Sequence, residues 1–291
     1  MSSPVASGAS PYQQRRARRQ FTDRRVLLVA IVVVIWAFYL FPLVWLVMMS
    51  LKTQIDMFAT PPLFVFAPTI AHYRETLTDS AFLAAARNSF IVTVASVVAS
   101  LVLGSLAGYS LARHQSKVSE QLAMGLIIGR MIPPIVFVVP LFLLFNQFGL
   151  RNTYVGLILV YTAFNLPFAV WMLRSFFEEV PIELEHAAMV DGASRLRAFW
   201  SITMPLAAAG LAATAVFAAI VAWSEFLFAL ILTGPDTTTL PIRLASFLTD
   251  RTVDWGGVAS TGVLVIVPLV ALGMLVQRNL IKGLTLGAMK G

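Results

Sequence analysis

The stretch VLLVAIVVVIWAFYLFPLVWLVMMSL, from Val26 to Leu51, contains no charged residue. A helix needs about 20 apolar residues to cross the hydrocarbon core of a bilayer, and this run is long enough to do so. It is too long for the apolar part of a removable signal peptide, and no small-residue cleavage site follows it. The stretch therefore predicts a first transmembrane helix over 26–51.

The chain as a whole is also strongly apolar and poor in charged residues. Of its 291 residues, 58% are hydrophobic and only 12% are charged, whereas soluble domains carry about 25% charged residues. The mean hydropathy is +0.83. Uncharged runs that recur along the chain predict an all-α membrane protein with six transmembrane helices. After the first, we expect spans near 88–112, 122–150, 152–173, 205–233 and 255–277.

Basic residues set the expected orientation. Six spans place both termini on one side, which then holds 14 Lys and Arg against 6 on the opposite side, with Arg130 inside a span. The positive-inside rule puts both termini in the cytoplasm, and we read the basic N-terminal tail as an orientation signal rather than a nucleic-acid site. The expected segments outside the spans are a cytoplasmic tail at 1–25, an external segment at 52–87 with an amphipathic helix at 69–86, a cytoplasmic loop at 174–204 and a cytoplasmic tail at 279–291.

Motifs for covalent chemistry are missing from the sequence. There is no cysteine, and His72, His114 and His186 lie too far apart for a metal-binding motif. No Gly-Lys pair exists, which excludes a phosphate-binding P-loop. The GLTLG stretch at Gly283–Gly287 mimics a nucleophile elbow but lacks a preceding strand and a histidine partner. We therefore expect no enzyme activity, no metal and no cofactor bound by this chain.

Two charged residues lie within the expected spans. A charge at mid-bilayer costs roughly 3 kcal/mol or more, so Arg130 and Glu225 should face the bundle interior, water or a partner. Both a polar translocation pathway and a structural ion pair or snorkelling arginine fit this position. The pathway candidates are Glu225, Trp223, Ser224 and Asn165. One alternative function is an ion-coupled secondary transporter that uses Glu225 and Arg130 as coupling charges.

A polar segment, EHAAMVDGASRLRAFWSITMP from Glu185 to Pro205, interrupts the apolar sequence. Pro181 suits the first turn of a helix, and Gly192 suits a left-handed helix cap. Ser194 can cap a second short helix over 195–202. The segment therefore predicts two short helices at an angle, and we interpret them as a docking surface for a cytoplasmic partner.

The same segment resembles the EAA loop of bacterial ABC importer permeases, with its Ala-Ala pair, a Gly four residues later and a closing Pro. The stretches NSFIVTVASVVASLVLGSLAGYSLAR, MIPPIVFVVPLFLLF, AWSEFLFALILT and QRNLIKGLTLGAMKG are similar to the carbohydrate branch, in particular to the maltose-transporter MalG family. The resemblance implies an ABC type-1 permease core over 87–278 in a bacterial cytoplasmic membrane. It also implies import of a sugar, a polyol or a glycerol phosphate.

The resemblance further implies an assembly with a second permease subunit, two cytoplasmic ATPases that hold the ATP and Mg, and an external solute-binding protein. The family often has Glu immediately before the Ala-Ala pair, whereas this chain has His186 there and Glu185 one position earlier. Either residue is therefore a candidate for the main ATPase contact. The implied coupling residues are Glu185, His186, Ala187, Ala188, Asp191, Gly192 and Pro205, with Gly283, Gly287 and Lys290 as tail contacts.

Overall fold

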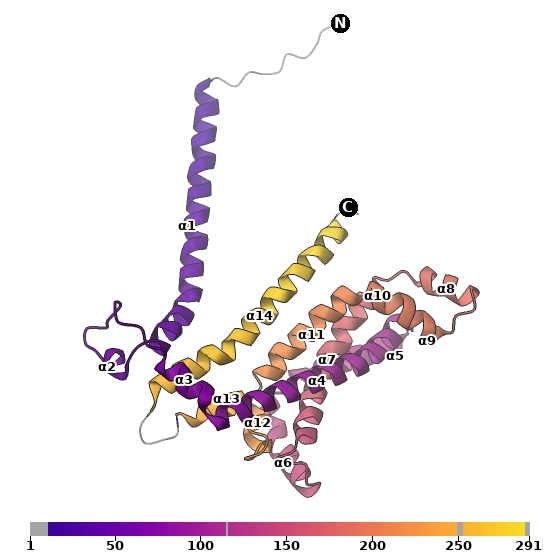
Figure 1. Cartoon of the computed structure of the whole chain (residues 1–291). Helices are drawn as coiled ribbons and strands as arrows, with labels where there is room; N and C mark the ends of the chain where they lie inside the picture. Colours follow the sequence, from indigo (N-terminus) through magenta and orange to yellow (C-terminus); the bar gives the residue numbers. More distant parts are fainter. Residues whose placement is uncertain (1–10, 115, 249–252, 289–291) are drawn as a thin grey trace.

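The computed structural model describes residues 11–114, 116–248 and 253–288, and within them it contains helices and connecting loops but no β-strand (Figure 1). Most elements are α-helices; η1 is a 3₁₀ turn and η2 is a π-helical segment. In chain order they are α1 (Pro11–Ser50), α2 (Gln54–Met57), α3 (Ala71–Thr78), α4 (Ser80–Arg113), α5 (Lys117–Met131), η1 (Pro134–Phe137), α6 (Val138–Gln147), α7 (Tyr154–Glu178), α8 (Ile182–Val190), α9 (Arg195–Ala198), η2 (Phe199–Thr203), α10 (Met204–Leu206), α11 (Ala208–Trp223), α12 (Leu227–Leu232), α13 (Leu240–Ser246) and α14 (Trp255–Ala288).

Four helices are long and apolar enough to cross a membrane: Val26–Ser50 within α1, α4, α7, and Trp255–Met274 within α14. Two bent pairs also qualify by length and composition. The first joins α5 to η1–α6 at 86°, and the second joins Arg195–Leu206 to α11 at 76°. If each bent pair is one span, the described residues contain six, and the predicted class of all-α membrane protein is confirmed.

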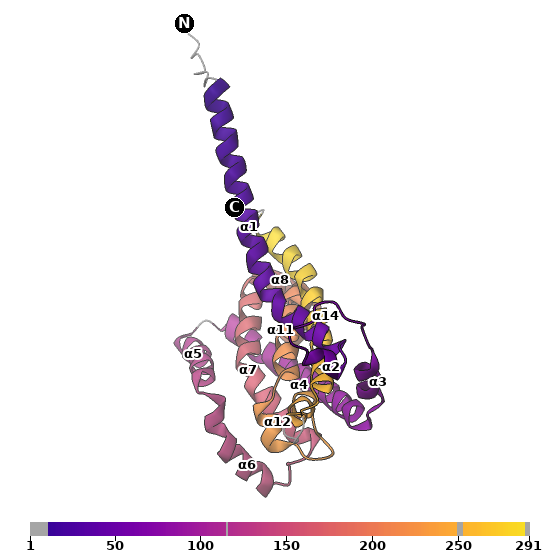
Figure 2. The same cartoon turned by 90° about the vertical axis from the view of Figure 1, so that its left-hand side faces the viewer.

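The centre of the bundle is the contact between α4 and α7, two helices that lie side by side in Figures 1 and 2. The face of α4 that meets α7 carries Gly104 and Gly108, one helical turn apart, so that the two backbones approach closely. A Cβ placed on Gly108 would lie 3.0 Å from both the Arg174 nitrogen and the Val170 oxygen of α7. The buried positions of α4 include many small or hydroxyl side chains: Ser89, Thr93, Ser96, Ser100, Gly104, Ser105 and Gly108.

The start of α4 differs from the predicted span at 88–112. Asp79 caps the helix, because its carboxylate accepts hydrogen bonds from the backbone N–H groups of Ala81 (3.0 Å) and Phe82 (3.1 Å). Arg243 donates to the same carboxylate at 2.7 Å. The single amphipathic helix predicted at 69–86 is therefore wrong: the chain forms α3, stops at Asp79, and begins α4 directly afterwards.

Two predicted spans are broken rather than continuous. In the first, Pro133 and Pro134 follow Ile132, and proline has no N–H to continue the helical ladder, so α5 ends at Met131. In the second, α11 ends at Trp223 and α12 begins at Leu227, although no Pro or Gly lies between them. There the Glu225 carboxylate accepts the backbone N–H of Phe228 at 2.8 Å and so satisfies one of the free N–H groups in the first turn of α12.

The end of the chain also differs from the prediction. We expected a span at 255–277 followed by an adaptable tail at 279–291. Instead, α14 continues without a break to Ala288 and includes both Gly283 and Gly287. Lys290, the third predicted tail contact, lies outside the described residues.

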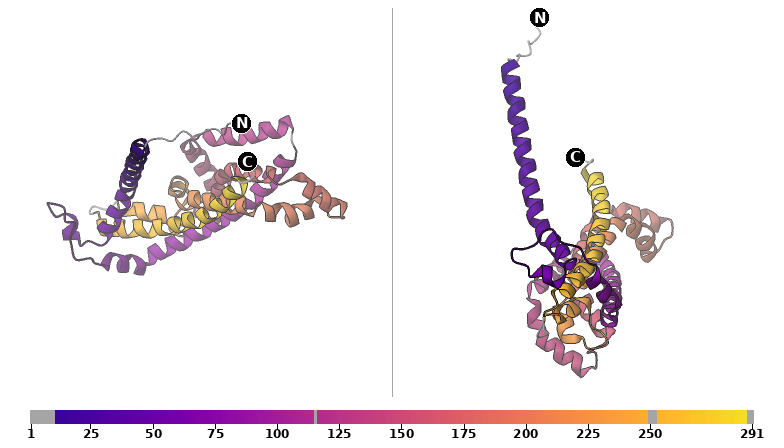
Figure 3. Two further views of the ribbon diagram at one scale, coloured as in Figure 1. Left: turned by 90° about the horizontal axis from the view of Figure 1, so that it is seen from above. Right: turned by 60° about the vertical axis from the view of Figure 1, so that its left-hand side comes forward.

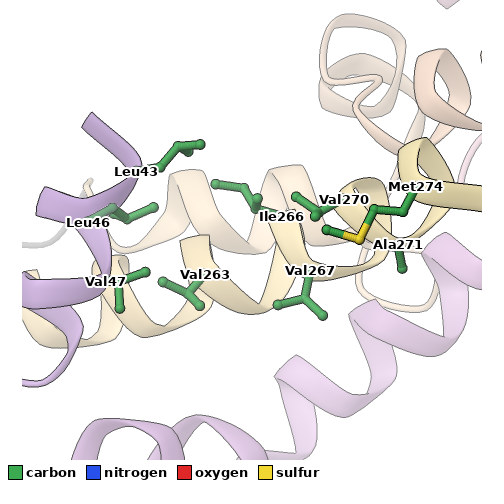
Figure 4. Close-up of a pocket in the computed structure, with 9 residues that line it drawn as sticks. All are labelled: Leu43, Leu46, Val47, Val263, Ile266, Val267, Val270, Ala271 and Met274. Carbon is green, nitrogen blue, oxygen red and sulfur yellow. The ribbon is translucent and has the colours of Figure 1, made fainter. Parts of the chain in front are cut away.

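Helix α1 stands apart from the bundle over most of its length (Figures 1 and 3), and residues 26–44 are all exposed in the single chain. Its C-terminal part approaches α14, and the two helices enclose an apolar groove of ≈ 400 Å³ (Figure 4). The side chains that line the groove come from both helices and are all apolar: Leu43, Leu46, Val47, Val263, Ile266, Val267, Val270, Ala271 and Met274. An apolar surface of this kind requires lipid or another apolar protein surface to cover it.

Candidate functional site

Helices α8 and α9 form a small hairpin that projects from one end of the bundle, as Figures 1 and 3 show. Helix α8 follows Pro181 and ends at Val190. Gly192 then takes a φ of 90°, and its N–H donates to the Met189 carbonyl at 3.1 Å. The N–H of Ala193 donates to the Ala188 carbonyl at 2.9 Å, which completes a Schellman motif. The helix break predicted at Gly192 is confirmed.

The second arm of the hairpin begins as the sequence indicates. The Ser194 hydroxyl accepts the backbone N–H of Arg197 at 3.3 Å and caps α9. The predicted helix at 195–202 is not uniform, because α9 ends at Ala198 and the π-helical segment η2 continues to Thr203. A π-helical turn shifts the register of the side chains that follow it, and such turns are frequent at functional sites.

The outward face of the hairpin is apolar at its tip and polar along its side. Val190 is 88% exposed and Leu196 is 61% exposed, so two large apolar side chains of the hairpin are open to a partner surface. Five predicted coupling residues are also exposed: His186, Ala187, Asp191, Gly192 and Pro205. Ala188 is half-buried. No part of the described chain covers the exposed residues of the hairpin.

Glu185, in contrast, points into the protein and is only 3% exposed. Its Oε1 accepts hydrogen bonds from Arg113 Nη2 at 2.7 Å and from the Thr203 hydroxyl at 2.6 Å. Its Oε2 accepts the hydroxyl of Tyr109 at 2.6 Å. Arg113 and Tyr109 lie on the last turns of α4, so Glu185 connects the hairpin to a membrane helix.

Arg113 extends this network to α7. Its Nη1 donates to the Phe177 carbonyl at 2.9 Å and its Nη2 to the Val180 carbonyl at 3.1 Å. The Phe177 carbonyl lies in the last turn of α7, where it also accepts the Val180 N–H at 3.2 Å, and the Val180 carbonyl lies just beyond that helix. Sequence reasoning missed Tyr109, Arg113 and Thr203. The signal that could have identified Arg113 was its predicted location on the same side of the membrane as Glu185.

The network fixes the ionisation of Glu185. Burial raises the pKa of the carboxyl group, but hydrogen bonds from Arg113, Thr203 and Tyr109 outweigh burial, and the net pKa lies below the ordinary value. A carboxyl group whose pKa is lowered by folding stabilises the folded state at pH values above the pKa that the same group has in the unfolded chain. That stability is lost only as the pH falls through the lower, folded-state pKa. Glu185 is therefore a carboxylate at neutral pH.

This arrangement corrects one sequence prediction. We expected Glu185 or His186 to make the main contact with a partner. Glu185 is wrong for that role in this structure, because its two oxygens are already bound to Arg113, Tyr109 and Thr203 inside the protein. His186, the next residue, is exposed on the outward face of α8.

The predicted pathway residues are distributed unevenly. Trp223 is 9% exposed and donates through Nε1 to the Val265 carbonyl of α14 at 3.1 Å, and Asn165 is 2% exposed within α7. Both residues are therefore buried within the chain in this conformation, and their role in a pathway stays a prediction. Ser224 is exposed and Glu225 is half-buried, both at the break between α11 and α12.

Arg130 is exposed and forms no ion pair with any described residue. Its guanidinium carbon lies 5.2 Å from the ring centroid of Phe168 on α7. Glu225 forms no ion pair within the described part of the chain either, so a structural pair between the two intramembrane charges is excluded there. In the described residues, no group of three or more His, Cys, Asp or Glu side chains could hold a metal ion.

Four long apolar helices, together with two bent helix pairs that are also apolar enough to span a bilayer, define a multi-pass membrane protein from whose bundle the α8–α9 hairpin projects. The chain belongs to the family of binding-protein-dependent transport system inner membrane components, whose model matches residues 100–286. It is 39% identical to a probable ABC transporter permease protein of Sinorhizobium fredii, over 92% of this chain and 97% of that protein. It is 33% identical to the trehalose/maltose transport system permease protein MalG of Thermococcus litoralis, over 94% and 99% of the two chains.

The fold is also that of a solved structure, a chain of a bacterial ABC transporter involved in the import of the acidic polysaccharide alginate. That chain matches with a TM-score of 0.74 at 22% identity, over 95% of this chain and 99% of the other. The protein is therefore an ABC importer permease, a multi-pass protein of the inner membrane and a transport component rather than an enzyme. The family does not favour the ion-coupled secondary transporter.

Proposed function

We propose that this chain is one permease subunit of an ATP-driven importer and that the α8–α9 hairpin is the docking surface for a cytoplasmic ATPase subunit. The observation that carries this proposal is the exposure of Val190 and Leu196 on a hairpin that projects from the bundle and is capped at Gly192 and Ser194. Exposed apolar side chains gain free energy when a partner surface covers them. The excess of basic residues on the same side supports a cytoplasmic location for this end of the bundle.

Substitution at the tip of the hairpin tests the docking surface. We expect Val190→Asp to reduce co-purification of the ATPase subunits at least tenfold, because it puts a charge at the centre of an apolar contact. The matched control is Ile55→Asp on α2, since Ile55 is 85% exposed and we place it on the external side. Co-purification at the wild-type level with Val190→Asp, or solute transport by this chain alone in liposomes without ATPase, would contradict the proposal.

A carbohydrate or a closely related polar solute is the proposed substrate class. The relative from Thermococcus litoralis is named for trehalose and maltose, and the structural neighbour is involved in alginate import. A sugar, a polyol and a glycerol phosphate all remain within this class. Stimulation of ATP hydrolysis by individual solutes, in the complex reconstituted with its solute-binding protein, identifies the substrate.

We assign the exposed length of α1 and the groove between α1 and α14 to the second permease subunit and to lipid. The groove is lined only by apolar side chains, as Figure 4 shows, and its volume is ≈ 400 Å³. The family's binding-protein dependence further supports an external solute-binding protein as partner. ATP and Mg would be held by the ATPase subunits. Each assignment can be tested by cysteine cross-linking, because the native chain has no cysteine that would interfere.

The break between α11 and α12 is the proposed solute-facing part of this subunit, with Ser224 and Glu225 as its polar groups. We expect Glu225→Ala to assemble normally but to raise the KM for uptake several-fold, because it removes both the charge and the acceptor for the Phe228 N–H. Loss of such a hydrogen bond costs about 1 kcal/mol. Glu225→Gln is the matched control, since it retains an acceptor oxygen. An unchanged uptake curve for Glu225→Gln would show that the charge of Glu225 is not needed for uptake, and that the residue only accepts the Phe228 N–H.

A further inference from the structure

The contacts of Glu185 form a compact polar cluster at the point where the hairpin meets the membrane helices. We define this Glu185 cluster by Tyr109, Arg113, Glu185 and Thr203. Arg113 and Glu185 are joined at 2.7 Å with side chains that are 10% and 5% exposed. Because the cluster is buried, its interactions are screened little by solvent or salt.

The cluster connects α8 to α4, to the end of α7 and to the end of η2. Tyr109 and Arg113 belong to α4, while Arg113 also holds the Phe177 and Val180 carbonyls at the end of α7. Thr203 ends η2 and immediately precedes α10, which leads into α11. Of the side chains in Ile182–Val190, Glu185 is the only one that hydrogen-bonds to these elements.

Aromatic packing surrounds the cluster and leaves little space for independent movement. The ring of Tyr109 lies 4.6 Å from that of Phe199 and 6.1 Å from that of Phe177, measured between centroids. Phe177 and Phe199 are both fully buried. Close-packed interiors transmit displacement rather than absorb it, so a movement of α8 should carry with it the ends of α4, α7 and η2.

We propose that the Glu185 cluster is the joint that transmits movement of the docked hairpin to α4, α7 and α11, and that Glu185 and Arg113 are positioning residues for coupling rather than contacts of the ATPase. This inference rests on the proposed docking function but makes a different claim. Docking depends on the outward face of the hairpin, whereas transmission depends on the inward face. The two roles therefore fall on adjacent residues of α8, His186 outward and Glu185 inward.

The test is the number of solute molecules imported per ATP hydrolysed, measured in the full complex in liposomes. Glu185→Gln keeps the size of the side chain and removes its charge, which leaves Arg113 without a counter-ion. We expect co-purification of the ATPase to stay within twofold of wild type and the complex to continue to hydrolyse ATP. The number of solute molecules imported per ATP should fall roughly tenfold. The matched control is Glu178→Gln, which removes the charge from the more exposed Arg174–Glu178 pair at 2.6 Å. It should leave solute per ATP within twofold of wild type.

Two milder variants keep the proposal testable if Glu185→Gln fails to accumulate. Tyr109→Phe and Thr203→Val each remove one hydrogen bond to Glu185 and leave the ion pair intact, so each should reduce solute per ATP by a smaller factor. The proposal is overturned if Glu185→Gln, or both milder variants, import at the wild-type ratio. It is also overturned if Glu185→Gln accumulates normally but loses the ATPase, because Glu185 would then act in docking. Failure of the docking function itself would instead appear in the wild-type complex, as absence of ATPase binding.

Discussion

Gly192→Pro is expected to abolish ATP-driven uptake while leaving insertion of the protein in the membrane unchanged. Gly192 has a φ of 90°, and proline is restricted to a φ of about −65°, so the two are incompatible. Proline also removes the N–H that donates to Met189. The Schellman motif at the end of α8 would be lost, and with it the fixed angle between α8 and α9. We expect uptake and ATPase co-purification both to fall at least tenfold.

A graded series at Gly192 separates backbone conformation from steric effects. No atom lies within 4 Å of a Cβ placed on this residue, so a side chain there meets no steric obstacle. Only the positive φ disfavours residues other than glycine. Asparagine tolerates this region, and Gly192→Asn should remain active. Gly192→Val should lose most of its activity, because a β-branched residue is strained there by roughly 1–2 kcal/mol or more.

The control for this series lies on the opposite end of the bundle. Gly149 follows α6, has a φ of 64°, and likewise has no atom within 4 Å of a Cβ placed on it. Gly149→Pro should disturb its own turn and leave ATPase co-purification at the wild-type level. Uptake at the wild-type rate by Gly192→Pro would show that the angle of the hairpin is not needed for coupling.

Features that depend on neighbouring residues in the chain could be predicted from the sequence. The caps at Gly192 and Ser194 follow from residues within one or two turns, and both are present in the structure. The apolar runs likewise indicated the spans. The inward orientation of Glu185 was not predictable in this way, because Arg113 lies 72 residues earlier and only the packing of α4 against α7 brings the two together. The break at Glu225 was missed because no Pro or Gly marks it.

Gly108→Val and Gly104→Val are expected to disrupt the packing of the two central helices, α4 and α7. A Cβ on Gly108 would lie 3.0 Å from two backbone atoms of α7, and a Cβ on Gly104 would lie 2.9 Å from the Cβ of Ala169. Backbone atoms cannot move aside as the end of a flexible side chain can, so α4 and α7 would have to separate. Overpacking of this kind costs about 1–3 kcal/mol per site, and occasionally more.

Loss of this contact would reach the functional site through helix geometry. Gly108 is adjacent to Tyr109, whose hydroxyl binds Glu185, and Arg113 lies about one turn further along the same helix. Separation of α4 from α7 at Gly108 would pull Arg113 away from the Phe177 and Val180 carbonyls that it holds. We therefore expect Gly108→Val to lower both the melting temperature in detergent and solute import per ATP, and Gly104→Val to act mainly on the melting temperature.

The chain supplies its own control for these two substitutions. Gly125 and Gly129 on α5 have the same four-residue spacing, but no atom of this chain lies within 4 Å of a Cβ placed on either. Gly125→Val and Gly129→Val should leave the melting temperature of the isolated subunit within a few degrees of wild type, since they create no clash within it. If Gly108→Val melts like these controls, the close approach of α4 and α7 is not what holds the bundle together. If it melts well below them, the close contact that fixes the fold also sets the position of Arg113 against Glu185.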